Sequence, residues 1–319
     1  MLSSLATGLP VGLDVVAHGA VLAHGGAGGL PAFGPLSVVT QARVELVPLL
    51  TVLVLGGLYL FGVARLRARG DAWPVGRTLS FVGLGLGSFA LATMSGLGAY
   101  DDDLFAVHMV QHMILAMITP VFLALGAPVT LALRTLPKGS RKGLLALLHS
   151  RPVALLTFPA LGWLLFVGNP FALYFSGWYE ATLESTALHE ILHLHFLAVG
   201  CLFFWPLLGI DPVPGKVSHP MRMLLVAATL PFHAFLGIAI MSVGDDGSAL
   251  LARDHYLALH PLAEAVSQQQ IGGGLLWASG DLVGLLFVFT LLFQWMRASE
   301  REAAREDRRL DRLEAAAPR

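Results

Sequence analysis

The stretch Phe105–Leu125 reads FAVHMVQHMILAMITPVFLAL, which is apolar enough to cross a bilayer and yet carries two histidines. His108 and His112 are four residues apart, so on a helix both imidazoles share one face. A second row at the same spacing consists of methionines, namely Met109, Met113 and Met117. An imidazole in a membrane helix is costly unless it faces the protein interior, a cavity or a partner. The stretch therefore predicts a membrane helix that supplies part of a metal site near one membrane face.

The composition of the whole chain is typical of an integral membrane protein. Of its 319 residues, 55% are hydrophobic and 13% are charged, with a mean hydropathy of +0.71. A soluble domain carries about twice that charged fraction. Seven segments reach the roughly 20 apolar residues that a spanning helix needs. They are approximately Leu46–Leu66, Leu79–Ala99, Phe105–Leu125, Val153–Tyr174, Ser185–Leu208, Met221–Val243 and Gly273–Met296. We therefore predict an all-α, polytopic membrane protein with a seven-transmembrane helix bundle.

The charges of the loops predict how this bundle is oriented. Arginines and lysines gather between the first and second spans, between the third and fourth, beside the loop from the fifth to the sixth, and after Met296. The alternate loops are acidic, as in Asp101–Asp103. The positive-inside rule then places the N-terminus outside and the C-terminus in the cytoplasm.

Three regions follow from this reading. Residues 1–44 form an extracytoplasmic arm rich in glycine and alanine, either loosely ordered or re-entrant, residues 45–297 form the seven-helix domain, and residues 298–319 form a charged cytoplasmic tail. A solvated charged helix is sufficient to explain the tail. If the arm closes over the metal site, His18 or His24 could contribute to it, although polar residues on a mobile arm explain both histidines more simply.

Further histidines fall at a similar predicted depth on other spans. His189 and His193 repeat the four-residue spacing on the fifth span, whereas His195 points well away from their face. His233 lies on the sixth span, one helical turn before Gly237, which would allow another helix to approach closely. The predicted topology places all these side chains in the outward half of the bilayer. The candidate metal ligands among the histidines are His108, His112, His189, His193 and His233.

The types of side chain favour copper as the metal. Imidazole together with thioether is a soft, mixed set that suits copper, Cu(I) especially. The candidate thioether ligands are Met109, Met113 and Met241, although ordinary apolar packing accounts for a methionine at least as well. Asp281 is costly in its apolar surroundings unless it is paired. We predict that Asp281 and Gln269 support the ligands from behind, with a helix-packing hydrogen bond as the alternative for Asp281. For the histidines, the alternative is hydrogen-bonded core residues.

These residues resemble those of a known family. The matching segments are His108–Val129, His189–Pro212, His233–Met241 and Gln268–Gly284, which read HMVQHMILAMITPVFLALGAPV, HEILHLHFLAVGCLFFWPLLGIDP, HAFLGIAIM and QQQIGGGLLWASGDLVG. With its seven predicted spans, the chain resembles the cytochrome c oxidase assembly factors of the Caa-type CtaG family, polytopic proteins of bacterial plasma membranes. The arm and the tail are not covered by the resemblance.

The resemblance implies a function that composition alone does not. We expect a non-enzymatic role in maturing haem–copper oxidases, with copper bound or delivered at the outer face of the plasma membrane. The implied partners are subunits of cytochrome c oxidase, the lipid bilayer and, as a further candidate, a soluble copper chaperone. No basic patch suggests nucleic acid.

Three other functions remain as alternatives. His189–His193 reads HEILH and so matches HExxH, the zinc-protease motif, with Glu190 as general base; against it, no convincing third carboxylate ligand follows. A haem-binding membrane protein would use histidines from facing helices as axial ligands. Copper transport across the membrane is disfavoured, because no ladder of histidine and methionine continues to the cytoplasmic side.

Overall fold

The computed structural model describes residues 30–212, 214 and 217–316. Within these ranges the chain forms helices joined by turns, and no strand. The all-α prediction is therefore confirmed. His18 and His24, the two candidates on the predicted arm, lie outside the described residues.

Six helices or continuous helical runs are long and apolar enough to cross a membrane. They are Leu46–Ala68, Val75–Tyr100, Phe105–Thr135, Thr186–Leu208, His219–Met241 and Leu262–Arg312. A seventh candidate is a pair of helices, α11 (Pro159–Tyr174) and α12 (Trp178–Glu184), with a bend of 70° between them. The fourth predicted span is thus shorter than expected, because Pro159 begins α11 and separates it from α10 (Arg151–Leu156).

Several of these runs are built from consecutive shorter helices. The second run comprises α3 (Val75–Thr78), the π-helical η1 (Leu79–Leu86), α4 (Gly87–Met94) and α5 (Gly96–Tyr100). The third comprises α6 (Phe105–Met113), the π-helical η2 (Ile114–Ile118), α7 (Thr119–Leu125) and α8 (Pro128–Thr135). The run His219–Met241 comprises α14 (His219–Ala227) and α15 (Leu230–Met241). The remaining short helices are α1 (Ser37–Thr40), α9 (Lys138–Leu148) and α16 (Arg253–Leu259).

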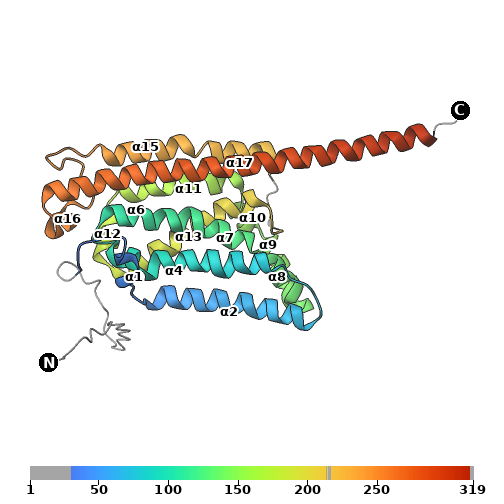
Figure 1. Cartoon of the computed structure of the whole chain (residues 1–319), viewed down its shortest axis with the longest axis horizontal. Coiled ribbons are helices and arrows are strands. Elements are labelled where there is room, and N and C mark those ends of the chain that lie inside the picture. The colour runs from blue at the N-terminus through green and yellow to red at the C-terminus, as the bar shows by residue number, and fades with distance from the viewer. Residues whose placement is uncertain (1–29, 213, 215–216, 317–319) are drawn as a thin grey trace, which may run out of the picture.

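The helix α13 (Thr186–Leu208) lies at the centre of the bundle. Of its most apolar window 61% is buried, against 28% for α2 (Leu46–Ala68) and for the run within α17 (Leu262–Ala316). Figure 1 shows α2 along one side and α15 with α17 along the other, with α4, α6, α7, α11 and α13 between them. α13 packs against α7, η2, α11 and α12, so its side chains are placed to meet those of the His108 helix.

The π-helical turn in the third span has a local cause. Pro120 has no N–H to donate to the carbonyl of Ala116, so the regular α-helical hydrogen bond is missing at that point. α13 comes very close here, because a Cβ built on Gly200 would lie only 2.2 Å from the Ala116 oxygen. Only glycine leaves room for this approach. The π-helical turn η2 and α13 are therefore in close contact one helical turn after His112 in the chain.

At the end of the bundle that carries α8, Asp211 holds the third span to the end of α13. Its carboxylate accepts hydrogen bonds from the backbone N–H of Val129 at 3.1 Å and of Thr130 at 2.8 Å, both in the first turn of α8. It also accepts from the Thr130 hydroxyl at 2.5 Å and from Trp205 Nε1 at 3.1 Å. A carboxylate is well suited to this position, since the N–H groups that begin a helix have no partner within the helix.

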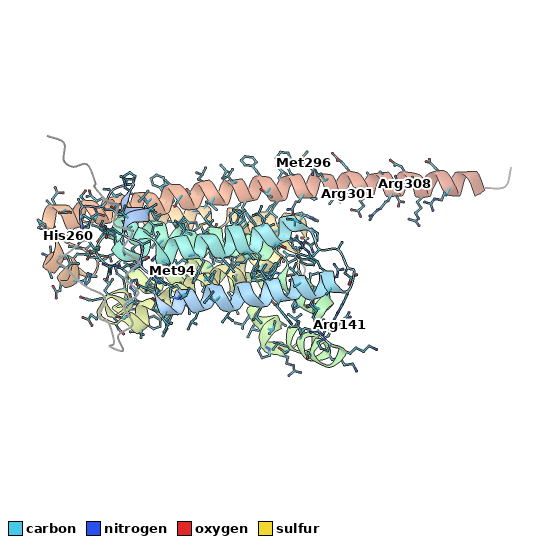
Figure 2. All side chains as sticks on the ribbon, turned by 60° about the horizontal axis from the view of Figure 1, so that its bottom comes forward. Met94, Arg141, His260, Met296, Arg301 and Arg308 are labelled. Carbon is cyan, nitrogen blue, oxygen red and sulfur yellow. The ribbon has the colours of Figure 1, made fainter. Side chains whose placement is uncertain are left out.

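The two ends of the bundle differ in charge. Figure 2 shows His260 at one end and Arg141 at the other, with Arg301 and Arg308 on the part of α17 that projects beyond the bundle. α17 is one unbroken helix of 55 residues, so it runs without interruption through the boundary predicted at residue 297. The basic end is the one predicted to face the cytoplasm, and the orientation remains a prediction from loop charge.

The described part of the predicted arm packs at the opposite end. Tyr100 donates its hydroxyl to the carbonyl of Pro31 at 2.6 Å, and Phe33 meets the Tyr100 ring edge-on at 5.2 Å. A Cβ on Gly96 would clash with the backbone of Ser37, which shows how tightly α1 sits on α5. Residues 30–40 therefore cover α5.

Candidate metal centre

Asp101 lies between two histidines of the central helix. Its Oδ2 is 2.8 Å from Nε2 of His189 and 3.1 Å from Nε2 of His193. The exposed fraction is 1% for Asp101 and His189 and 3% for His193, so water does not reach the group. The potential ligand atoms of these three side chains all lie within 4.8 Å of one another. Among the described residues this is a group with the composition and spacing of a metal site.

Local structure places each member of the group. The Ser185 side chain accepts from the N–H of Leu188 and so caps the start of α13, one turn before His189. His189 and His193 then share a face of α13, as their spacing predicted. Asp101 lies in the turn between α5 and α6, and Gln111 steadies it by donating to Oδ2 at 2.7 Å and to the Ala92 carbonyl at 3.1 Å.

The surroundings of Asp101 keep its carboxyl charged. Burial alone would raise the pKa of Asp101, but the charge and hydrogen bond of His189, with those of His193, outweigh it and hold that pKa well below its usual value. The other carboxylate oxygen, Oδ1, is buried and has no hydrogen-bond partner among the described residues. A buried carboxylate with an unsatisfied oxygen is costly, and a cation between Asp101 and the imidazoles would offset that cost.

His108 and His112 form a second group with Tyr174 of α11. The Tyr174 hydroxyl lies 2.9 Å from Nε2 of His108 and 3.0 Å from Nδ1 of His112. The same hydroxyl is 3.8 Å from the sulfur of Met109. Because one phenol has a single hydrogen to donate, at least one of the two imidazoles must donate to its oxygen. Tyr174 thus sets how both rings are turned.

The four histidines form a continuous row across two helices. Ring centroids are 4.6 Å apart for His193 and His189, 6.4 Å for His189 and His108, and 6.4 Å for His108 and His112. The structure therefore brings these four predicted side chains together. His195, predicted to point away from this face, contacts Asn169 at 2.8 Å and is not part of the row.

Aromatic side chains cover this row at the end where α12 and α16 lie. Tyr179 packs on His108 with ring centroids 5.1 Å apart and meets the Tyr256 hydroxyl at 2.6 Å. Phe105 lies edge-on to Tyr174, Tyr179 and Tyr256 at 5.8–6.1 Å. The cover seen within the described residues thus comes from α6, α12 and α16.

The remaining predicted ligands lie elsewhere. His233 of α15, together with Met113, lines a small cavity on the far side of His112. Met241 lies at the end of α15, against Gly273 and Gly274 of α17. The structure therefore divides the predicted single cluster into the Asp101 group, the Tyr174 group with His108, His112 and Met109, a small cavity that His112 also lines, and an outlying methionine.

The two residues predicted to support the ligands have other partners. Gln269 accepts from the N–H of Leu251 at 2.8 Å and donates to the carbonyls of Ile240 and Ala249 at 2.9 and 3.0 Å. Asp281 accepts from Trp277 Nε1 at 2.9 Å on the same helix. None of these hydrogen bonds involves an imidazole. Gln269 instead fixes the loop after α15, and Asp281 makes a helix hydrogen bond, the alternative given for it above.

Asp101 and Tyr174 were not predicted from the sequence as site residues. Asp101 is the first of three consecutive aspartates, and this run fits an acidic surface loop equally well. Tyr174 ends an apolar helix, where a tyrosine is common at a membrane interface. A signal did exist for Asp101, since it directly precedes the His108 helix and would start at the same depth as His189.

A larger hollow lies beside the aromatic cover, apart from the histidine row. It measures about 540 Å³ and opens between residues 30–33, α5, α6 and α17. Its polar lining includes Asp103, His260 and Glu264, and its apolar lining includes Val110 and Leu275. The candidate ligands and this hollow therefore do not coincide.

The fold and the cluster define a class: an all-helical, polytopic membrane protein with a buried carboxylate–imidazole group. The comparison with known families is more specific. Residues 57–298 match the family described as cytochrome c oxidase caa3 assembly factor (Caa3_CtaG). The chain belongs to this family, and the predicted resemblance is confirmed.

Similar proteins are found in mycobacteria. The chain is 40% identical over 260 residues to an uncharacterized protein of Mycobacterium bovis and to one of Mycobacterium tuberculosis, covering 79% of this chain and 39% of each relative. It is 39% identical over 268 residues to an uncharacterized protein of Mycobacterium leprae, covering 82% of this chain and 40% of that one. The chain thus spans about two fifths of the length of these relatives. No solved structure matches the chain.

Proposed function

We propose that this assembly factor binds copper at Asp101, His189 and His193 and holds it for insertion into a haem–copper cytochrome c oxidase. The observation that carries the proposal is the contact of one buried carboxylate with both imidazoles of the HxxxH pair, at 2.8 and 3.1 Å. Copper is here the cargo of the protein. Subunits of the oxidase are the proposed partners, and the outer face of the plasma membrane is the proposed location.

The donor set supports copper on chemical grounds. Imidazole nitrogen suits copper and zinc, and among divalent first-row metals Cu(II) binds most tightly to a given nitrogen and oxygen site. One carboxylate cancels part of the charge of the ion, which matters in a site that water does not reach. An ion bound there would replace the hydrogens shared between Asp101 and the two rings, while Gln111 would still hold the carboxylate in place.

Metal analysis of the purified protein tests the proposal. His193→Ala should lose most of the bound copper, whereas His195→Ala, a histidine on the same helix that contacts Asn169, should retain it. Oxidase activity in cells that carry the same variants should fall with His193→Ala only. Equal copper content in the two variants, or zinc or haem in place of copper in the wild type, would refute the assignment.

One observation favours a second candidate, a zinc-dependent hydrolase. Asp101 supplies the carboxylate that the HEILH motif lacked in sequence, and Glu190 is 9% exposed with its Oε2 buried and without a hydrogen-bond partner among the described residues. In such an enzyme Glu190 would activate a metal-bound water. Glu190→Gln decides between the two: a hydrolase should lose function with its metal retained, while a copper carrier should keep both.

A further inference from the structure

The small cavity beyond His112 has an unusual lining. It measures about 20 Å³, enough for a single water-sized occupant, and lies where η2 meets α11, α13, α15 and α17. Two imidazoles and two thioethers reach its wall, from His112, Met113, Met117 and His233. The rest of the wall is apolar apart from Asn169 and includes Phe166, Phe196 and Leu276; no carboxylate lines it.

Each of these imidazoles has a ring nitrogen that makes no hydrogen bond within the described residues. Nδ1 of His233 is buried and has no hydrogen-bond partner among the described residues. Nδ1 of His112 is held by the Tyr174 hydroxyl at 3.0 Å, which leaves Nε2 of that ring as its coordinating atom. A hydrogen bond on one ring nitrogen that fixes the other for coordination is the usual support of a metal-bound histidine.

The fold positions these donors with some precision. The π-helical turn at Ile114–Ile118 changes the helical phase between Met113 and Met117, and single π-turns in α-helices are frequent at functional sites. Gly280 of α17 makes room for the His233 ring, since a Cβ there would lie 3.0 Å from it. Methionine is also a common filler of irregular gaps. That explanation covers the thioethers and leaves the two imidazoles unexplained.

We infer that this cavity is a second copper station, distinct from the Asp101 centre, that takes Cu(I) through His112, Met113, Met117 and His233. Thioether ligands select Cu(I), and a monovalent ion needs no carboxylate for balance in an apolar wall. The choice of copper rests on the function proposed above.

The two stations are joined by the row of imidazoles already described. His112 lines the cavity, and its ring is 6.4 Å from that of His108, which is 6.4 Å from His189. The carboxylate-containing site at one end of the row would favour Cu(II), and the thioether-containing site at the other would favour Cu(I).

Titration of the full chain with Cu(I) under anaerobic, reducing conditions, against a coloured Cu(I) chelator, tests this inference. The double variant Met113→Leu with Met117→Leu nearly conserves side-chain volume and should weaken Cu(I) binding by at least about tenfold, the lower end of what a lost supporting group costs a metal site. Met94→Leu, on α4 and outside the cavity wall, is the matched control and should bind as the wild type does.

Two further measurements separate the two stations. Asp101→Asn should weaken Cu(II) binding by at least about tenfold and leave the Cu(I) affinity within about twofold. X-ray absorption of the Cu(I)-loaded wild type should show sulfur neighbours that the double variant lacks. Unchanged Cu(I) affinity in the double variant, or a Cu(I) spectrum without sulfur, overturns the second station even if the Asp101 centre binds copper. Sulfur-ligated Cu(I) in a chain that binds no Cu(II) would uphold the station and refute the Asp101 proposal.

Discussion

Oδ2 of Asp101 lies 2.8 Å from Nε2 of His189, a residue 88 positions later in the chain. The contact joins the turn before the third membrane span to the first turn of the central helix. Its members are buried, and the charge of the carboxyl is maintained by its partners. A buried polar pair of this kind contributes little net stability when compared with apolar packing. We therefore expect Asp101 and His189 to serve metal binding rather than stability.

Asp101→Asn should therefore separate binding from folding. The amide keeps the shape of the side chain but loses the negative charge and one acceptor oxygen, so copper affinity should fall by at least about tenfold, as for other altered metal sites. Isothermal titration with Cu(II) measures it. Asp103→Asn, two residues along the same turn and outside the metal group, makes the same charge change and should bind normally. Equal losses in both variants would show that only the charge of the loop matters.

Tyr174→Phe tests the support of the other histidine pair. The change removes the hydroxyl that contacts both His108 and His112. We expect a 10- to 100-fold loss of Cu(I) affinity together with a stability loss of about 1–3 kcal/mol from unsatisfied ring nitrogens. Chelator competition and thermal unfolding in detergent measure the two effects.

Tyr179→Phe provides the comparison for that variant. Its hydroxyl contacts that of Tyr256 in the aromatic cover, and its ring packs on His108 in the same way with or without the oxygen. Metal affinity should be retained. If both tyrosine variants lose affinity equally, the cover as a whole rather than the Tyr174 hydroxyl determines how the imidazoles are held.

The sequence was sufficient to predict the helices and to predict which histidines lie on the same face of a helix. Spacing fixes which side chains share a helical face, and so His108 with His112, and His189 with His193, could be predicted. Spacing carries no information about which turn meets which helix. The partnership of Asp101 with His189 depends on how α5, α6 and α13 pack, and the separate cavity at His233 depends on the π-helical turn; neither leaves a periodic signal.

Two predictions that differ from the structure concern polar residues of α17. Asp281 was predicted to support a ligand because a polar group in an apolar helix needs a partner, and Gln269 was given the same role. For Gln269 the partners are the backbone at residues 240–251, and for Asp281 the indole of Trp277 donates to one carboxylate oxygen. A buried polar residue predicts that a partner exists and does not identify it.

Gly200→Ala should disturb the site through packing alone. The added Cβ would come within 2.2 Å of the Ala116 carbonyl oxygen, so α13 and η2 must move apart. Overpacking of this kind costs about 1–3 kcal/mol, and Cu(I) affinity should fall because Met117 and His112 shift with η2. Gly168→Ala on α11 has open space around its Cβ and should be neutral or slightly stabilising, since alanine favours helix. Equal stability of the two variants would argue against a tight contact at Gly200.

In contrast to the variants of the metal ligands, Asp211→Asn should lower the stability of the protein and leave metal binding unchanged. The carboxylate of Asp211 accepts four hydrogen bonds at the far end of the third span, two on each oxygen. An amide keeps one accepting oxygen and turns an NH₂ group toward donors, so we expect a loss of about 3 kcal/mol in stability. Asp71→Asn, at the same end of the bundle, removes only an exposed ion pair with Arg134 at 3.8 Å and should cost less than about 1 kcal/mol. Thermal unfolding in detergent measures both, and copper content is read on the same samples. Asp211 is joined to the histidines only through the length of α7 and α13. If folded Asp211→Asn loses copper, the third span and the central helix must move as one rigid unit. The metal site would then depend on both ends of the bundle.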